Sequence, residues 1–153
     1  GFLEGKRLIR YHRLWETFLV NVLGCSWDEV HHEAENLEHA CSDDLINRID
    51  AYLNFPRVDP HGNPIPDKDG AIKTSENEQP LSTIPINQKV TVKRFVSFDS
   101  QYLKYISDRG LVIGSELTVC EKLDFDDSLL CKVNEEAITV SALSAKHIFV
   151  VKV

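Results

Sequence analysis

Apolar residues in the first third of the chain recur every three or four positions, which is the period of an α-helix with one buried face. The first such stripe consists of Leu8, Ile9, Trp15, Leu19, Val22 and Leu23. It predicts one long helix over residues 3–23. Gly24 is a suitable end for it, because glycine readily adopts the left-handed conformation that closes helices.

Two further helices are predicted before residue 55. Ser26 is followed three positions later by Glu29, which is the capping-box pattern, so a second helix should run over about residues 27–40. Ser42 should cap a third helix, with apolar side chains at helical spacing at Leu45, Ile46, Ile49 and Leu53. Three helices in so short a stretch form a thin core, so this part should bury an apolar face against a partner.

The first helix offers four candidates for that face, Trp15, Phe18, Leu19 and Val22. The alternative is that these side chains belong to the ordinary core of one chain. The hydrophobic pattern leaves both interpretations open.

The pattern changes after the helices. All six prolines lie between residues 56 and 85, which predicts a linker, because proline removes backbone donors and interrupts regular elements. Beyond it, β-type patterns occupy residues 89–96, 116–122, 129–133, 138–140 and 148–153, and a short helix is expected over 99–108. The prediction is an α+β chain: a helical domain over 1–55, a linker over 56–85, and a small SH3-like β-barrel over 86–153.

The composition of the chain excludes several classes of function. The formal net charge is -7, which argues against this chain itself gripping nucleic acid, since phosphate binding needs excess Lys and Arg. The four cysteines form no C-x-x-C pair and are expected to be reduced thiols of a cytoplasmic protein. No apolar run approaches the roughly 20 residues of a membrane span. The chain contains no methionine, so we expect it to be a fragment of a longer protein.

The predicted second helix carries a dense run of possible metal ligands, VHHEAENLEHA. Residues three and four apart share a helix face, so one ridge should consist of His31, Glu35, Glu38 and His39. His32 and Glu33 are turned away and are interpreted as surface residues. A solvated Glu/His face is the alternative for the whole ridge.

The first helix carries His12 and Glu16, again four apart. Two facing helices that each present a His/Glu pair are a known way to build a divalent-metal site in a helical bundle. Imidazoles and carboxylates without thiolate suit Mn(II), Fe(II), Co(II), Ni(II) or Zn(II). No catalytic motif is visible: H-E-x-x-H is absent, as are a nucleophile elbow and a phosphate loop, so an enzyme is not expected.

Three motifs together, YHRLWETFL, VHHEAENLEH and DPHGNPIP, resemble the diphtheria-toxin-repressor-like family of iron- and manganese-dependent regulators. The resemblance covers about residues 3–153. It implies a winged helix-turn-helix domain, a helical dimerisation domain and an SH3-like, FeoA-type domain. The chain begins where the first of these ends, so contacts with operator DNA are expected only from a missing N-terminal domain.

The resemblance implies two metal sites. The ancillary site matches His12, Glu16 and His31 together with a residue of the SH3-like domain, for which Asp99 is the best match and Gln101 the fallback.

The primary site matches Glu35, Glu38 and His39, and is completed in the family by residues of the N-terminal domain. In the iron-type branch the first of these positions is a cysteine. Glu35 in its place resembles the manganese-type branch, because a harder carboxylate favours Mn(II). We therefore predict Mn(II) over Fe(II), with Zn, Co or Ni binding possible in vitro.

The implied function is the metal-sensing and dimerising part of a metal-dependent transcriptional repressor, acting as a homodimer. By resemblance, the same module also occurs behind metal-transporter permeases, so a sensing or docking domain of a transporter is the alternative. A peptide-binding role for the SH3-like domain is disfavoured, since the chain lacks the aromatic cluster of polyproline-binding grooves.

Overall fold

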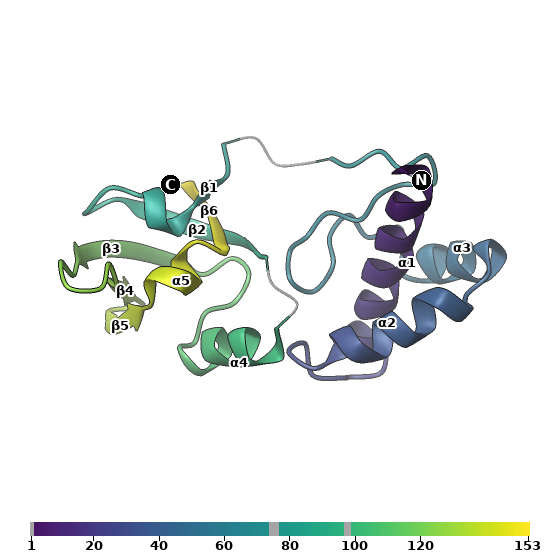
Figure 1. Ribbon diagram of the computed structural model, residues 1–153, viewed down its shortest axis with the longest axis horizontal. Helices are drawn as coiled ribbons and strands as arrows, with labels where there is room; N and C mark the ends of the chain where they lie inside the picture. The colour runs from purple at the N-terminus through teal and green to yellow at the C-terminus, as the bar shows by residue number, and fades with distance from the viewer. Residues whose placement is uncertain (1, 74–76, 97–98) are drawn as a thin grey trace. The chain divides into compact units, whose positions relative to one another are not determined.

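The computed structural model describes residues 2–73, 77–96 and 99–153, with side chains from residue 4 onward (Figure 1). The chain divides into two compact units, Gly1–Thr74 and Ser75–Val153. The first is helical and the second is built on an antiparallel sheet, so the predicted α+β class is confirmed. Among the described helices, none has the length and apolar character needed to cross a membrane.

The helical unit contains α1 (Phe2–Asn21), α2 (Val30–Ala40) and α3 (Asp43–Tyr52). Its core consists of the buried side chains Tyr11, Leu14, Trp15, Leu19, Val30, Ala34 and Ile46. These residues come from all three helices, so the amphipathic stripes predicted from the sequence face one another. Their burial removes apolar surface from water and is what fixes α1 against α2 and α3.

Two of the four candidates for a partner face lie in this core. Trp15 and Leu19 are 9% and 7% exposed, and Phe18 packs against the same cluster. Val22 is 40% exposed. The core interpretation therefore holds for Trp15 and Leu19, because α2 and α3 cover this side of α1.

The ends of the helices follow only part of the predicted capping. Ser42 caps α3 as predicted, its side chain accepting a hydrogen bond of 3.1 Å from the Leu45 amide. The prediction that Ser26 caps α2 is wrong. The helix begins at Val30, after a turn over residues 27–29, and the Ser26 hydroxyl bonds the nearby Asp28 carboxylate instead. That local side-chain bond competes with capping.

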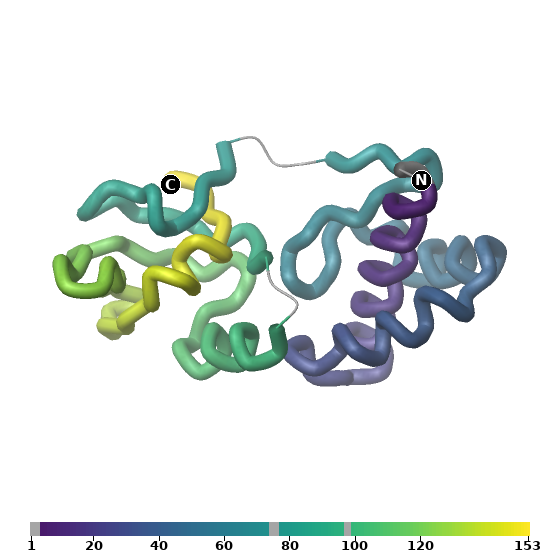
Figure 2. The backbone as a smooth tube through the Cα atoms, in the orientation of Figure 1, coloured from purple at the N-terminus to yellow at the C-terminus, as the bar shows by residue number. Residues whose placement is uncertain are grey.

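The segment after α3, the first part of the linker predicted over 56–85, forms local structure of its own. A tight loop is closed by a bridge between Val58 and Pro64 and by a 2.9 Å hydrogen bond from the Asp59 amide to the Asn63 carbonyl. Figure 2 shows this segment folding back beside α1, where Arg13 donates to the Pro64 carbonyl at 2.5 Å. The Asp59 carboxylate organises the loop by accepting from two backbone amides, which a composition-based linker prediction does not consider.

The second unit is a six-stranded antiparallel sheet in the order β1-β6-β2-β3-β4-β5. Its elements are β1 (Gln79–Pro80), a 3-10 turn (Leu81–Thr83), β2 (Lys89–Phe95), α4 (Ser100–Asp108), β3 (Glu116–Lys122), β4 (Leu129–Val133), β5 (Glu136–Val140), α5 (Ala142–Ala145) and β6 (Ile148–Lys152). The five predicted strands and the short helix expected over 99–108 are confirmed, and β1, the 3-10 turn and α5 are additions. Val90 and Val92 are alternate residues of β2 and are fully buried, as expected for a strand with one face on a core. Phe95 is fully buried as well, beyond a register shift between Val92 and Arg94.

Candidate metal centre

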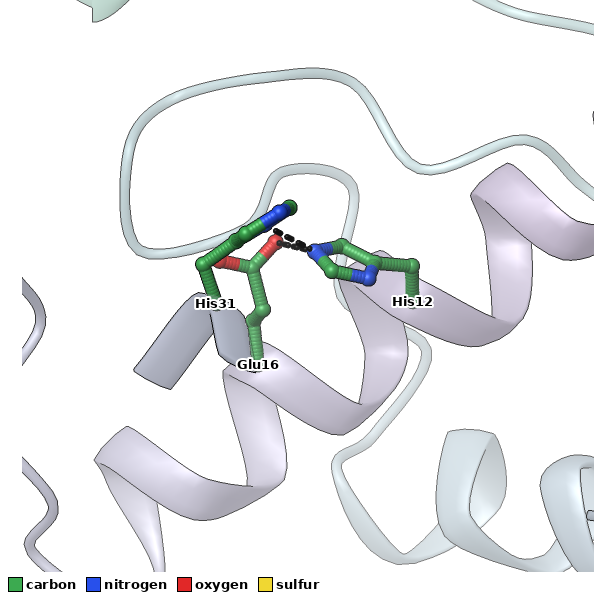
Figure 3. A group of neighbouring side chains, drawn as sticks. All are labelled: His12, Glu16 and His31. Atoms are coloured by element: carbon green, nitrogen blue, oxygen red, sulfur yellow. Dashed lines mark hydrogen bonds and ion pairs between the residues drawn. The ribbon is translucent and has the colours of Figure 1, made fainter. Parts of the chain in front are cut away.

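Three possible ligands predicted from the sequence converge between α1 and α2. His12 and Glu16 are one turn apart on α1, and the His12 Nε2 lies 3.0 Å from the Glu16 Oε1. His31, in the first turn of α2, places its Nδ1 2.9 Å from the same His12 Nε2 (Figure 3). Two imidazole nitrogens and a carboxylate oxygen from two helices therefore face a common point.

The burial of this group follows from the helical core beside it. His12 is 7% exposed and Glu16 only 2%, while His31 is partly buried. The neighbouring residues on α1, Tyr11 and Trp15, are core side chains, so the turn that carries His12 and Glu16 is held against α2. Buried polar groups of this kind are costly unless they are paired or bind a cation.

The second ring nitrogen of His12 also has a partner. His12 Nδ1 lies 2.8 Å from Glu38 Oε2, and since a carboxylate accepts, the Nδ1–H donates. Burial opposes the charged form of His12, but Glu16 and Glu38 outweigh it, so the pKa of His12 is raised above its ordinary value. Burial and repulsion by the charge of His12 lower the pKa of His31. Of the two imidazoles, His31 is thus the one that more readily presents a bare nitrogen.

The donor set fits a divalent transition metal. Ligands bound at roughly 2.1 Å around one ion lie about 3 to 3.5 Å from one another, close to the 2.9 and 3.0 Å separations at His12. The remaining carboxylate oxygen, Glu16 Oε2, is buried and receives no hydrogen bond. The hydrogen bond from His12 to Glu38 is the kind of support that orients a metal-ligating histidine and sets its tautomer.

The ligands predicted for the primary site, Glu35, Glu38 and His39, converge less closely than those of the ancillary site. His39 Nε2 lies 3.4 Å from Glu38 Oε1, and Glu35 Oε2 lies 4.0 Å from His31 Nε2. The Glu35 and His39 side chains are 55% and 64% exposed. In the described part of the chain, Glu35, Glu38 and His39 do not form a group with all three ligand atoms within 4.8 Å of one another. Glu38 instead turns toward His12.

Asp99 belongs to the second unit, where it stands at the start of a helix. It is the N-cap of α4, and its carboxylate accepts a 2.8 Å hydrogen bond from the Gln101 amide. Gln101 itself is exposed in the first turn of that helix. The assignment of Asp99, or of Gln101, to the ancillary site stays a prediction.

The sequence interpretation missed two residues of this centre. Asp59 and His61, placed in the expected linker, are 5% and 4% exposed, and they form with Glu16 a second group of converging ligand atoms. Burial, and then repulsion by Glu16, raises the pKa of Asp59 to about 6. The available signal was the DPHGN motif, in which an Asp two residues before a His and four before an Asn is typical of a side-chain-closed turn.

Comparison with known proteins agrees with the division into two units. Residues 1–67 match the model of the "Iron dependent repressor, metal binding and dimerisation domain" family, and residues 79–152 match the "FeoA domain" family. The fold is similar to that of a solved manganese-dependent transcriptional repressor in complex with manganese, with a TM-score of 0.91 and 41% sequence identity. That likeness covers 97% of this chain and 73% of the other.

Two curated relatives belong to different classes of protein, a transcriptional repressor and a membrane protein of a transport system. The iron-dependent repressor IdeR of Mycobacterium tuberculosis is 33% identical over 126 residues, which are 73% of this chain and 54% of the relative. A probable metal transport system membrane protein of Chlamydia trachomatis is 42% identical over 66 residues, which are 43% of this chain and 15% of the relative. The chain thus spans about half the length of the curated repressors it matches. Because the likeness to the manganese-dependent repressor covers nearly the whole chain at this identity, the chain belongs to the family of iron- and manganese-dependent transcriptional regulators that includes the diphtheria toxin repressor.

Proposed function

We propose that this chain is the metal-sensing and dimerising part of a Mn(II)- or Fe(II)-dependent transcriptional repressor, and that His12, Glu16 and His31 hold its metal. The observation that carries the proposal is the convergence of His12 Nε2, Glu16 Oε1 and His31 Nδ1 in a largely buried position between two helices. Family membership supports the same role.

In this proposal a bound divalent cation replaces a proton and links α1 to α2. Neighbouring residues hold the ligands in position for this replacement of a proton by a cation. Glu38 accepts the Nδ1–H of His12 and so leaves the Nε2 to face Glu16 and His31. The core around Trp15 holds the two helices at this spacing and keeps bulk water from one side of the site. Metal binding then adds to the stability of one arrangement of α1 and α2.

Glu38 offers a route by which the two predicted sites communicate. It contacts His12 of one site and, through its other oxygen, His39 of the other. Completion of the Glu35, Glu38 and His39 set would need ligands from elsewhere, in the family from an N-terminal DNA-binding domain. Metal at that junction would then favour one position of the DNA-binding domain, which is a coupling free energy between metal and DNA. In a homodimer, two such DNA-binding domains would fit two operator half-sites. Such a repressor would act in the cytoplasm.

We infer Mn(II) as the preferred ion, with Fe(II) second. The ligand set contains two histidines and carboxylates, and Glu35 supplies an oxygen where a softer thiolate would favour other metals. The manganese complex of the structurally similar repressor supports this choice.

Calorimetric titration of the metal-free chain with Mn(II) tests the proposal. The wild type should bind, and the pair His12→Ala and His31→Ala should abolish binding at this site. His32→Ala is the matched control, because His32 is adjacent to His31 on α2 but exposed and outside the group of ligands. Absence of binding in the wild type, or equal binding in the double variant, would contradict the proposed function.

The likeness to the chlamydial membrane protein favours one second candidate, a sensing domain attached to a metal transporter. The repressor remains preferred because the repressor likeness covers most of this chain and the transporter likeness 43% of it. Expression of the full-length gene product decides between the two. Mn(II)-dependent retardation of operator DNA by a product outside the membrane fraction supports the repressor, and a product retained in membranes without DNA binding supports the transporter.

A further inference from the structure

We propose that Glu16, Asp59 and His61 form a second divalent-metal site, which shares the Glu16 carboxylate with the site of His12 and His31. The inference rests on the proposed metal-sensing function and extends it to residues outside both predicted sites. One ligand atom from each of the three side chains lies within 4.8 Å of the other two, and all three residues are at least nine-tenths buried.

The loop after α3 presents Asp59 and His61 to α1. One oxygen of Asp59, Oδ1, accepts the backbone amides of His61 and Asn63 at 2.8 and 2.9 Å. The turn is thereby closed and Oδ1 is occupied. The other oxygen, Oδ2, forms a loose ion pair with Arg13, whose Nε lies 4.0 Å away, too far for a hydrogen bond. A cation bound by Asp59 would therefore use this buried Oδ2 and compete with the Arg13 charge for it.

The tautomer of His61 follows from its other partner. His61 Nε2 lies 2.5 Å from the Trp27 carbonyl, which can only accept, so Nε2 carries a hydrogen. The Trp27 and His61 rings are also in contact, with centroids 5.3 Å apart, which helps to fix the imidazole. In the neutral ring the Nδ1 lone pair must then point away from Trp27. It points at Glu16 Oε2, 3.3 Å away.

Two electron-rich atoms face each other here. Glu16 Oε2 is buried and receives no hydrogen bond, and the neutral His61 Nδ1 has none to donate. Their 3.3 Å separation is that of two neighbouring ligands of one ion bound at roughly 2.1 Å. A divalent cation between them, completed by Asp59, would satisfy both atoms. A proton on His61 is the competing explanation, and the experiment distinguishes the two.

The two sites would be joined through one carboxylate. Glu16 Oε1 faces His12 and Glu16 Oε2 faces His61, which is the arrangement of a carboxylate bridging two ions. Imidazole and carboxylate donors select the same class of metal as the first site, a divalent transition ion such as Mn(II). Repulsion between the two cations should make the second ion bind more weakly than the first.

Mn(II) alone is the probe, added to the full chain. Equilibrium binding counts the ions, and electron paramagnetic resonance detects a carboxylate-bridged Mn(II) pair by the spin coupling between its members. The variants Asp59→Asn and His61→Gln should each lose the more weakly bound Mn(II) ion and the coupled-pair signal. The more tightly bound ion at His12 and His31 should remain, and its binding also shows that the variants are folded.

Asp67→Asn is a matched control. Asp67 closes a turn by accepting the amides of Asp69 and Ala71, the same spacing as at Asp59, but it is exposed and outside the ligand group. It should keep both ions. The variant pair Glu35→Gln and His39→Gln should keep the coupled signal, which excludes the other predicted site as its source.

The outcomes separate this inference from the proposed function. Loss of a bridged ion in Asp59→Asn and His61→Gln supports it. Unchanged Mn(II) number and affinity in both variants would overturn it while leaving the His12 site intact, and would identify His61 as a protonated partner of Glu16. Absence of all Mn(II) binding in the wild type would overturn both.

Discussion

The Nδ1 of His12, on α1, donates a 2.8 Å hydrogen bond to the Glu38 carboxylate, 26 residues later on α2. Glu38 lies in the same sequence motif as His31, yet the two contact different nitrogens of the His12 ring. Glu38 contacts Nδ1, while His31 faces Nε2. His12 is therefore held from both sides by α2. This contact makes Glu38 a positioning residue for one metal site and a predicted ligand of another.

The first prediction concerns Glu38 as a support for His12. Glu38→Gln should weaken Mn(II) binding at the His12 site by about 10- to 100-fold, as is typical when the hydrogen-bond partner of a ligating histidine is lost. Titration calorimetry should be done in a background carrying Glu35→Gln and His39→Gln, so that the second predicted site does not contribute. Glu33→Gln, an exposed carboxylate on the same helix, is the control. Equal affinity in the Glu38 and Glu33 variants would contradict the positioning role.

The second prediction is the pH dependence of metal binding. Metal and proton compete for His12 Nε2, and the pKa of His12 is raised by Glu16 and Glu38 against the opposing effect of burial. Affinity for Mn(II) should therefore begin to fall, as pH decreases, above the ordinary histidine pKa of about 6.5. Because the pKa of His31 is lowered, His31 should not add to this early loss. Titrations from about pH 8 to about pH 5.5 test this, and a pH-independent affinity would contradict it.

The third prediction concerns the stability of the metal-free chain. The pKa of Asp59 is raised to about 6 by burial and by Glu16, so the folded state binds more protons than the unfolded state below that pH. Stability should accordingly decrease as pH rises from about 4 to about 6. Asp59→Asn keeps an acceptor for the two turn amides and removes the buried charge. It should raise the free energy of unfolding near neutral pH by up to about 3 kcal/mol.

Urea denaturation with a chelator present measures this effect. The advantage of Asp59→Asn should vanish below about pH 4, where the wild-type carboxyl is protonated in both states. Asp67→Asn, at an exposed turn of the same type, should change stability little at either pH. A lower stability of Asp59→Asn near neutral pH would contradict the interpretation that the buried charge of Asp59 destabilises the metal-free chain.

The fourth prediction separates two serines that share a helix-start pattern. Ser42 accepts the Leu45 amide at the start of α3, so Ser42→Ala should destabilise the helical unit by about 1 kcal/mol. Ser26 caps no helix, and Ser26→Ala should cost less than about half of that. Thermal unfolding of both variants tests the difference. Equal losses would show that Ser26 stabilises α2 in spite of its distance from Val30.

The hydrophobic period and the β-type alternation determined most elements of this protein: three helices, then five strands and a short helix, all in the predicted order. The short elements β1 and α5 were not predicted from these patterns. The same period placed His12 with Glu16 on one face of α1, because residues four apart on a helix are neighbours. These are local properties of the chain, and local propensity and side-chain spacing are sufficient to predict them.

Only the tertiary structure decided which faces meet. The ridge of His31, Glu35, Glu38 and His39 is one feature in the sequence, but the packing of α2 on α1 turns His31 and Glu38 to His12 and leaves Glu35 and His39 exposed. Periodicity fixes which residues share a face and carries no information on the partner of that face. The burial of Asp59 and His61 against Glu16 depends on a side-chain-closed turn and on core packing between residues more than 40 positions apart, so composition alone predicted a linker there.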